Sequence, residues 1–188
     1  MGRYRPPPPP RSNYITPQGA AALKGELDRL WRIERPAVTR AVAEAAAQGD
    51  RSENAEYIYG KKQLAAIDRR VRHLRKRLAS VQIVDRAPDD AARIYFGAWF
   101  ELDDEAGRTQ LFRLVGPDEF DHRPEYLSMD SPLGRAVRGK GIGEDVVVEA
   151  PGGAKRYTVA HVAYGEQGSY DRRKKKARPK PGESQGEL

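Results

Sequence analysis

Two carboxylates stand three positions apart in the segment 49–57, at Asp50 and Glu53. Carboxylate oxygens suit Mg²⁺, which typically takes one or two protein carboxylates and keeps its other positions for water and phosphate. Two carboxylates bind this ion weakly alone, so a metal role needs further ligands from another macromolecule. An acid at the third position after Asp also matches the capping box that starts a helix. The residues themselves leave both interpretations open.

A cluster of cations follows this acidic pair. Residues 60–80 carry eight Lys and Arg side chains and a single acid, Asp68. Such a surface can bind phosphates, with an affinity that falls as salt rises. The alternative is the solvated face of a helix.

The elements that position these residues are two long helices. From Tyr14 to about Asp85 the apolar pattern is helical, and Thr16-Pro17 is typical of an N-cap followed by the first helical residue. Gly49 breaks the pattern, and we expect Pro36 to bend the first arm. The second arm carries a heptad seam at Leu64, Ile67, Val71, Leu74, Leu78 and Val81. Residues 14–87 are therefore predicted to form an antiparallel coiled-coil hairpin whose acidic turn is a free tip.

Residues 88–165 change to a strand pattern and predict a globular α+β domain. We expect one short helix to pack on an antiparallel sheet. That helix begins at Ser131-Pro132 and runs to about Arg138. The predicted strands are 94–102, 110–115, 126–129, 145–150 and 156–164, with Gly- and Pro-containing turns between them.

Composition excludes several classes of protein. The 188 residues include no Cys, so there is no disulfide framework, thiol nucleophile or Cys-ligated metal. No apolar run is long enough for a membrane helix, and the N-terminus lacks the apolar core of a signal peptide, so we expect a cytoplasmic protein that does not engage membranes. Residues 1–13, with five consecutive prolines, and the basic residues 166–188 are predicted to be disordered.

The net charge of +7 divides unevenly along the chain. Residues 14–87 carry 15 basic and 9 acidic side chains, whereas residues 88–165 carry 9 basic and 14 acidic ones. The surplus thus resolves into a basic rod with an acidic tip, an acidic globular domain and basic tails.

Several segments together carry a resemblance to a known family. Residues 30–36, 49–57, 67–71, 96–99 and 129–136 resemble the bacterial transcript cleavage factors of the Gre family, and within it the GreB branch more than the GreA branch. The match runs from about Tyr14 to Tyr164 and leaves out both tails. The resemblance implies a coiled-coil hairpin followed by an FKBP-like domain.

The resemblance also implies a function. Gre factors bind bacterial RNA polymerase at its secondary channel, and the tip reaches the active centre, where polymerase cleaves the backtracked nascent RNA near its 3′ end. Asp50 and Glu53 match the acidic pair thought to stabilise a second Mg²⁺ shared with the polymerase active site, an ion that the chain alone does not hold stably. On this interpretation the chain is a monomer that stimulates the nuclease activity of another enzyme.

Further residues take roles from the same resemblance. Asp130, Ser131 and Pro132 match the segment that contacts the rim of the channel on the largest polymerase subunit, and they also have the pattern of a turn and helix cap. The predicted RNA-binding set is Lys61, Lys62, Arg69, Arg70, Arg72, Arg75 and Lys76.

Other functions are compatible with the same residues. One alternative is a regulator of the same fold that occupies the channel without stimulating cleavage. Another is a coiled coil that binds RNA with no polymerase partner. Prolyl isomerase activity, which the FKBP-like fold invites, has no signature here, and Trp99, Phe100 and Phe112 are expected to be core.

Overall fold

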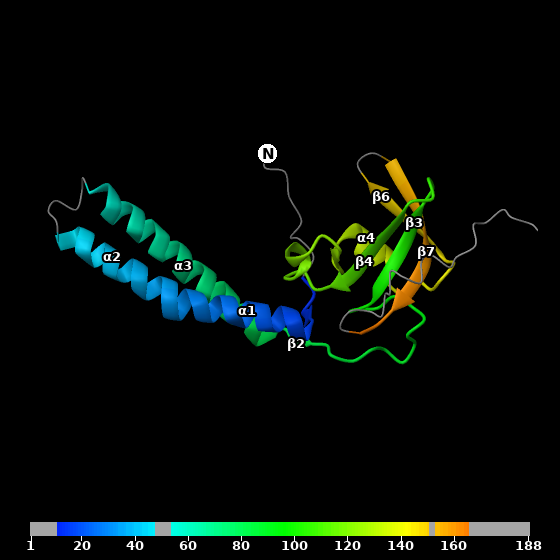
Figure 1. The fold of residues 1–188 in the computed structure, drawn as a ribbon, viewed down its shortest axis with the longest axis horizontal. Coiled ribbons are helices and arrows are strands. Elements are labelled where there is room, and N and C mark those ends of the chain that lie inside the picture. Colours follow the sequence, from blue (N-terminus) through cyan, green and yellow to red (C-terminus); the bar gives the residue numbers. More distant parts are fainter. Residues whose placement is uncertain (1–10, 48–53, 151–152, 166–188) are drawn as a thin grey trace, which may run out of the picture.

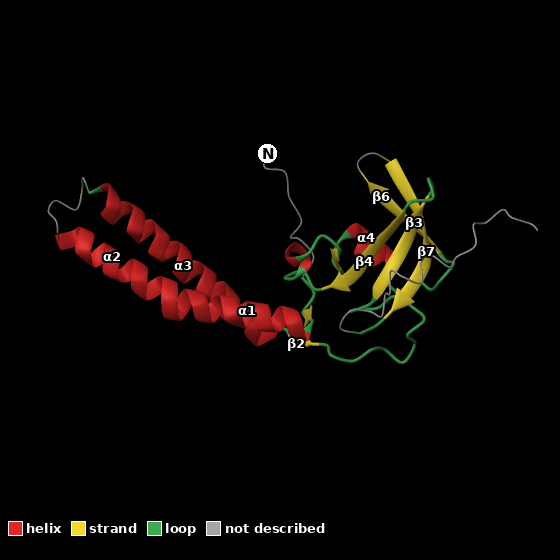
Figure 2. Ribbon diagram, viewed as in Figure 1, coloured by secondary structure: helices red, strands yellow, loops and turns green. Residues whose placement is uncertain are grey.

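A computed structural model of the chain describes residues 11–47, 54–150 and 153–165. Paired helices form a rod at one end of the molecule, and the strands gather in a separate domain at the other end (Figure 1). Figure 2 shows the same division by element type, with only short helical segments among the strands. No helix in the described ranges is long and apolar enough to cross a membrane.

The first arm of the rod consists of α1 (Pro17–Arg29), a π-helical segment η1 (Leu30–Glu34) and α2 (Arg35–Ala47). Thr16 is the N-cap as predicted, because its hydroxyl accepts the N–H of Gly19 at 3.0 Å. The second arm is α3 (Ala55–Ser80), a helix of 26 residues. At about 1.5 Å per residue, α3 is roughly 39 Å long.

The π-helical segment lies where the sequence predicted a bend at Pro36. Proline has no N–H to donate, and its ring crowds the carbonyl four positions earlier. The chain widens just before it, so that the N–H of Arg35 donates to the carbonyl of Leu30, five positions back. A disturbance before Pro36 was predictable, but its π-helical form was not.

The predicted seam forms the core of the rod. Ile67, Val71 and Leu74 of α3 are buried against Leu23 and Leu30 of the first arm. The antiparallel hairpin is therefore confirmed. Its two arms meet again at the base, where β1 (Tyr14–Ile15) pairs in parallel with β2 (Gln82–Ile83), a contact the sequence did not indicate.

The second domain is a five-stranded sheet in the order β5-β4-β3-β7-β6. Its strands are β3 (Trp99–Asp104), β4 (Thr109–Val115), β5 (Tyr126–Ser128), β6 (Asp145–Ala150) and β7 (Gly153–Ala163). The short helix α4 (Pro132–Val137) contributes Val137 to a core that includes Phe100, Leu102 and Leu114. The α+β class and the core position of Phe100 are confirmed.

Two expectations about this sheet are wrong. The sheet is mixed, because β5 runs parallel to β4 after a connection through the 3₁₀ turn η2 (Phe120–His122). The strand expected from Ile94 begins only at Trp99, since Gly97 has φ +86° and turns the chain out of an extended path. Ile94 is nevertheless fully buried, so the apolar residue at this position indicates a place in the core and not a strand.

Candidate functional site

The predicted acidic pair, Asp50 and Glu53, lies outside the described residues. What the structure describes is the pair of helix ends beside it, Ala47 of α2 and Ala55 of α3, at the end of the rod away from the sheet domain (Figure 1). Residues 48–53, called the tip from here on, join these two ends. The rod therefore places these two helix ends far from the sheet.

Asn54 ties the two helix ends together. Its side-chain oxygen accepts the N–H of Tyr57 at 3.1 Å and makes Asn54 the N-cap of α3. Its side-chain nitrogen donates to the carbonyl of Ala45 in α2 at 2.8 Å. The capping interpretation of Asp50 is therefore wrong for the start of α3, because Asn54 fills that position.

The two arms approach closely just below the tip. Gly60 of α3 is buried, and a Cβ added to it would lie 2.6 Å from Cγ2 of Val42 in α2. A distance that short is steric overlap, so the helices can pack this tightly only with glycine here. The rod is slender where it approaches the tip.

The predicted RNA-binding cations divide into two groups. Lys62, Arg69, Arg72 and Lys76 are exposed, and no ion pair is found for them within the described ranges. Their spacings of 7, 3 and 4 residues place them on the side of α3 opposite the seam. We call these four residues the cationic stripe.

The other three cations contact neighbouring side chains. Arg70 pairs with Glu26 of α1 through two hydrogen bonds of 2.7 Å. The guanidinium of Arg75 stands 4.5 Å from the centre of the Trp31 ring, and the Lys61 ammonium stands 5.4 Å from the centre of the Tyr57 ring. These contacts hold the two arms or the local helix together, so phosphate binding by Arg70 or Arg75 would compete with them.

The pair between Arg70 and Glu26 also changes how these groups titrate. The hydrogen bond from the guanidinium lowers the pKa of Glu26 below its ordinary value of 4.5, against the opposing effect of burial. The same hydrogen bond raises the pKa of Arg70. Glu26 is therefore ionised at neutral pH and keeps Arg70 directed across the hairpin.

The Asp130-Ser131-Pro132 segment forms the predicted turn and cap. The Ser131 hydroxyl accepts the N–H of Gly134 at 3.0 Å and donates to the carbonyl of Ser128 at 2.7 Å, so Ser131 is the N-cap of α4. Pro132 is exposed. The Asp130 carboxylate accepts the backbone N–H of Ser12 at 2.8 Å, which places the inner end of the N-terminal arm beside this segment.

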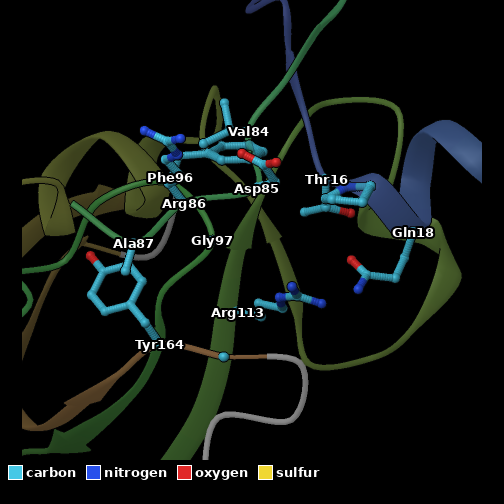
Figure 3. Close-up of a pocket in the computed structure, with 12 residues that line it drawn as sticks. Thr16, Gln18, Val84, Asp85, Arg86, Ala87, Phe96, Gly97, Arg113 and Tyr164 are labelled. Atoms are coloured by element: carbon cyan, nitrogen blue, oxygen red, sulfur yellow. The ribbon is translucent and has the colours of Figure 1, made fainter.

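A cavity of about 390 Å³ opens between the base of the rod and the sheet domain. Figure 3 shows Arg113 projecting into it from β4, with Thr16 and Gln18 on the side of α1 and Tyr164 at the end of β7. The side chain of Arg113 is buried beside the rings of Trp99 and Tyr126, and its Nε has no hydrogen-bond partner among the described residues. The sequence did not predict this cavity.

Metal binding within a single chain finds no support among the residues that the structure describes. They contain no group of three or more His, Asp or Glu side chains placed to hold an ion. The donors predicted for Mg²⁺ are the two carboxylates of the tip, a set that fits its preference for oxygen ligands but leaves most positions to other molecules.

Sequence reasoning missed Asp118 and Glu119, which lie at the junction between the rod and the sheet domain, the two bodies of the molecule. It interpreted 116–118 only as a turn. Two glycines could have pointed to this junction, Gly19 in the first turn of a helix and Gly116 after a strand. The sequence does not show which residues they approach.

Comparison with known proteins finds family matches for both the rod and the sheet domain. Residues 13–83 match the family described as transcription elongation factor, N-terminal, and residues 89–164 match transcription elongation factor, GreA/GreB, C-term. Transcription elongation factor GreB of Pseudomonas aeruginosa is 54% identical over 164 residues, which is 87% of this chain and 98% of that protein. GreB of Haemophilus influenzae is 56% identical over 143 residues, or 76% and 90% of the two chains.

Among solved structures, the crystal structure of GreA factor homolog 1 of Thermus thermophilus aligns with 81% of this chain and 99% of its own. Its sequence identity is 23% and its TM-score 0.38.

Proposed function

Because the chain belongs to the GreA/GreB family of transcription elongation factors, we propose that it binds bacterial RNA polymerase through the secondary channel and stimulates cleavage of backtracked nascent RNA. Cleavage would release arrested complexes by leaving a new RNA 3′ end. The observation that carries the proposal is the separation of the rod from the sheet domain, which puts the far ends of α2 and α3 at one end of the molecule and the sheet domain, the proposed docking surface, at the other (Figure 1).

The tip carboxylates are the proposed contribution to chemistry. Asp50 and Glu53 would hold a Mg²⁺ shared with the polymerase active site and would orient the attacking water through their oxygens. When bound, a second metal ion stabilises the attacking and leaving oxygens of an in-line displacement and lowers the pKa of water. The chain would thus be no nuclease by itself, since polymerase supplies the remaining ligands.

Asn54 is the residue that would hold this pair in place. Its two side-chain hydrogen bonds connect α2 and α3 immediately beside the tip. A connection fixed at both ends loses less conformational freedom when its carboxylates meet the metal, so more of the binding energy remains for the transition state.

The cationic stripe is the proposed contact for extruded RNA. Lys62, Arg69, Arg72 and Lys76 run along one side of the rod and can each release counterions from a phosphate. Lys61, Arg70 and Arg75 are proposed as secondary contacts, because each already contacts a neighbouring side chain.

Docking on the largest polymerase subunit is proposed for Asp130, Ser131 and Pro132. The Ser131 cap holds the start of α4 rigidly at the surface, beside the exposed ring of Pro132. Acting with bacterial polymerase, the chain would work in the cytoplasm, and we propose that it does so as a monomer.

The test is to add the purified chain to a backtracked polymerase complex with labelled RNA, with and without Mg²⁺. The proposal predicts Mg²⁺-dependent shortening of the RNA beyond that of polymerase alone. Binding to polymerase without shortening would identify the alternative, a channel regulator that does not stimulate cleavage. Absence of polymerase binding, with RNA binding retained, would leave only an RNA-binding coiled coil.

A further inference from the structure

The junction between the rod and the sheet domain contains a fully buried carboxylate. Glu119, in the loop after β4, has no exposed side-chain surface. Its oxygens accept the backbone N–H of Thr16 at 3.1 Å, the backbone N–H of Gly116 at 3.1 Å and the hydroxyl of Thr16. Three hydrogen-bond donors satisfy this buried carboxylate, so Glu119 makes a specific contact between the two bodies.

Glu119 completes the cap of a helix that belongs to the other body. The hydroxyl of Thr16 accepts the N–H of Gly19 and donates to Glu119, so it connects the first turn of α1 to the carboxylate. The first turn of α1 has no acidic residue of its own. The negative charge that favours a helix N-terminus is therefore supplied by the sheet domain.

Two glycines allow the bodies to come this close. A Cβ added to Gly19 would overlap the Glu119 carboxylate and lie 2.6 Å from its Cγ. A Cβ added to Gly116 would overlap the backbone carbonyl of Tyr14. Neither residue has a positive φ, so the close approach of the two bodies, and not backbone conformation, explains why glycine stands at both positions.

A second attachment joins the same loop to the other arm. Asp118 pairs with Arg77 in the last turn of α3 at 2.6 Å, and both side chains are largely buried. Arg77 also donates to the side-chain oxygen of Asn13 at 3.0 Å and to the carbonyl of Ser12. The loop thus holds α1 through Glu119 and α3 through Asp118, and two separate attachments resist the swivel that one would permit.

We infer that Glu119 and Asp118 are positioning residues that set the direction of the rod, and thereby the place of the tip, from the opposite end of the molecule. The inference rests on the proposed function for the importance of that place. The lever is long. With α3 about 39 Å in length, a rotation of about 10° at the junction moves the far end by roughly 7 Å.

The decisive variant is Gly19→Ala, with Gly25→Ala as its matched control. Both replace a glycine of α1 by a residue that favours helix, so a purely local effect would be equal or stabilising in each. A Cβ at Gly25 meets nothing within 4 Å, whereas one at Gly19 displaces the Glu119 carboxylate. Glu119→Gln is the second variant, since its amide nitrogen would face donors where the carboxylate now accepts.

The first measurement is a distance between spin labels on the two bodies. The chain has no Cys, so Ala65→Cys on α3 and Ala106→Cys on the sheet domain, both exposed, give one unique pair. We expect a narrow distance distribution in the parent and in Gly25→Ala, and a shifted or broadened one in Gly19→Ala and Glu119→Gln. An unchanged distribution in both of the latter variants would overturn the inference, whatever the tip does.

The second measurement separates positioning from docking. In the backtracked complex at saturating factor, we expect Gly19→Ala and Glu119→Gln to lower the cleavage rate by about 10- to 100-fold, the scale of misplaced catalytic groups. Their Kd for polymerase should stay within about threefold of the parent. A changed distance with an unchanged cleavage rate would also overturn the inference. Failure of the proposed function itself would appear separately, as no stimulation by the parent chain.

Discussion

Asn54→Ala tests whether the tip is held by its two flanking helix ends. The substitution removes the N-cap of α3, which costs about 1 kcal/mol, and the hydrogen bond to Ala45, which contributes about another 1 kcal/mol. The last turn of α2 and the first turn of α3 would then open locally. Because the seam residues Ile67, Val71 and Leu74 are far along α3, the rest of the rod would stay folded.

Asn54→Ser separates the two contributions. Serine is also a good N-cap, so it preserves the start of α3 while losing the donor to Ala45. Hydrogen exchange at the Tyr57 amide reports the cap directly, and we expect about fivefold faster exchange for a loss of about 1 kcal/mol in Asn54→Ala only. The backtracked-complex assay reports the tip, and we expect Asn54→Ala to stimulate cleavage about tenfold less, with Asn54→Ser intermediate.

Binding to polymerase is the control for both variants, since Asn54 is remote from the predicted docking segment at Asp130. If Asn54→Ala exchanges rapidly at Tyr57 yet stimulates cleavage like the parent, the claim that Asn54 positions the tip is refuted.

The remaining predictions concern the rod and the docking surface. Charge reversal of the stripe by Arg69→Glu should weaken action on long backtracked RNA more than on short RNA and reduce the salt dependence, and equal loss on both would count against an RNA contact. Arg70→Gln should instead lower the unfolding free energy by about 0.5 kcal/mol or less at pH 7, because its pair with Glu26 is partly exposed, a change measured by urea denaturation. Because the pKa of Glu26 is lowered in the folded state, its pair with Arg70 contributes fully to stability above pH 4.5 and loses this contribution as the pH falls through the folded-state pKa. The difference in unfolding free energy between the parent and Glu26→Gln should therefore vanish in acid. Asp130→Ala should weaken competition for polymerase, and an unchanged Kd would remove Asp130 from the interface.

The helical part of the fold was predictable because its determinants are local. The apolar residues of α3 recur at spacings of three and four, and Thr16-Pro17 carries its own start signal. The parallel course of β5 was not predictable in this way, since the direction of a strand after a 3₁₀ turn depends on contacts far along the chain. The same holds for the β1–β2 pair at the base of the rod, because the whole hairpin separates Ile15 from Ile83 along the chain.

The candidate site shows the same limit. The type and spacing of Asp50 and Glu53 left a metal role and a helix cap open, and the charge of α3 left open a phosphate-binding surface or a solvated helix face. Which cations are available was not visible, because Arg70 finds Glu26 only when the arms pair. Glu119 was hidden for a similar reason. A glutamate in a polar loop predicts solvent exposure, and only its donors on α1 explain its complete burial.

The most direct test of the central claim is RNA cleavage by backtracked polymerase in the presence of Asp50→Asn and Glu53→Gln, measured beside the affinity of each variant for polymerase. We predict that each variant loses nearly all stimulation while its Kd stays close to that of the parent, because in the proposed mechanism the tip supplies metal ligands and the sheet domain supplies docking. If both variants shorten the RNA at the parent rate while bound to polymerase, the carboxylates of the tip do not carry the chemistry, and the assignment is wrong.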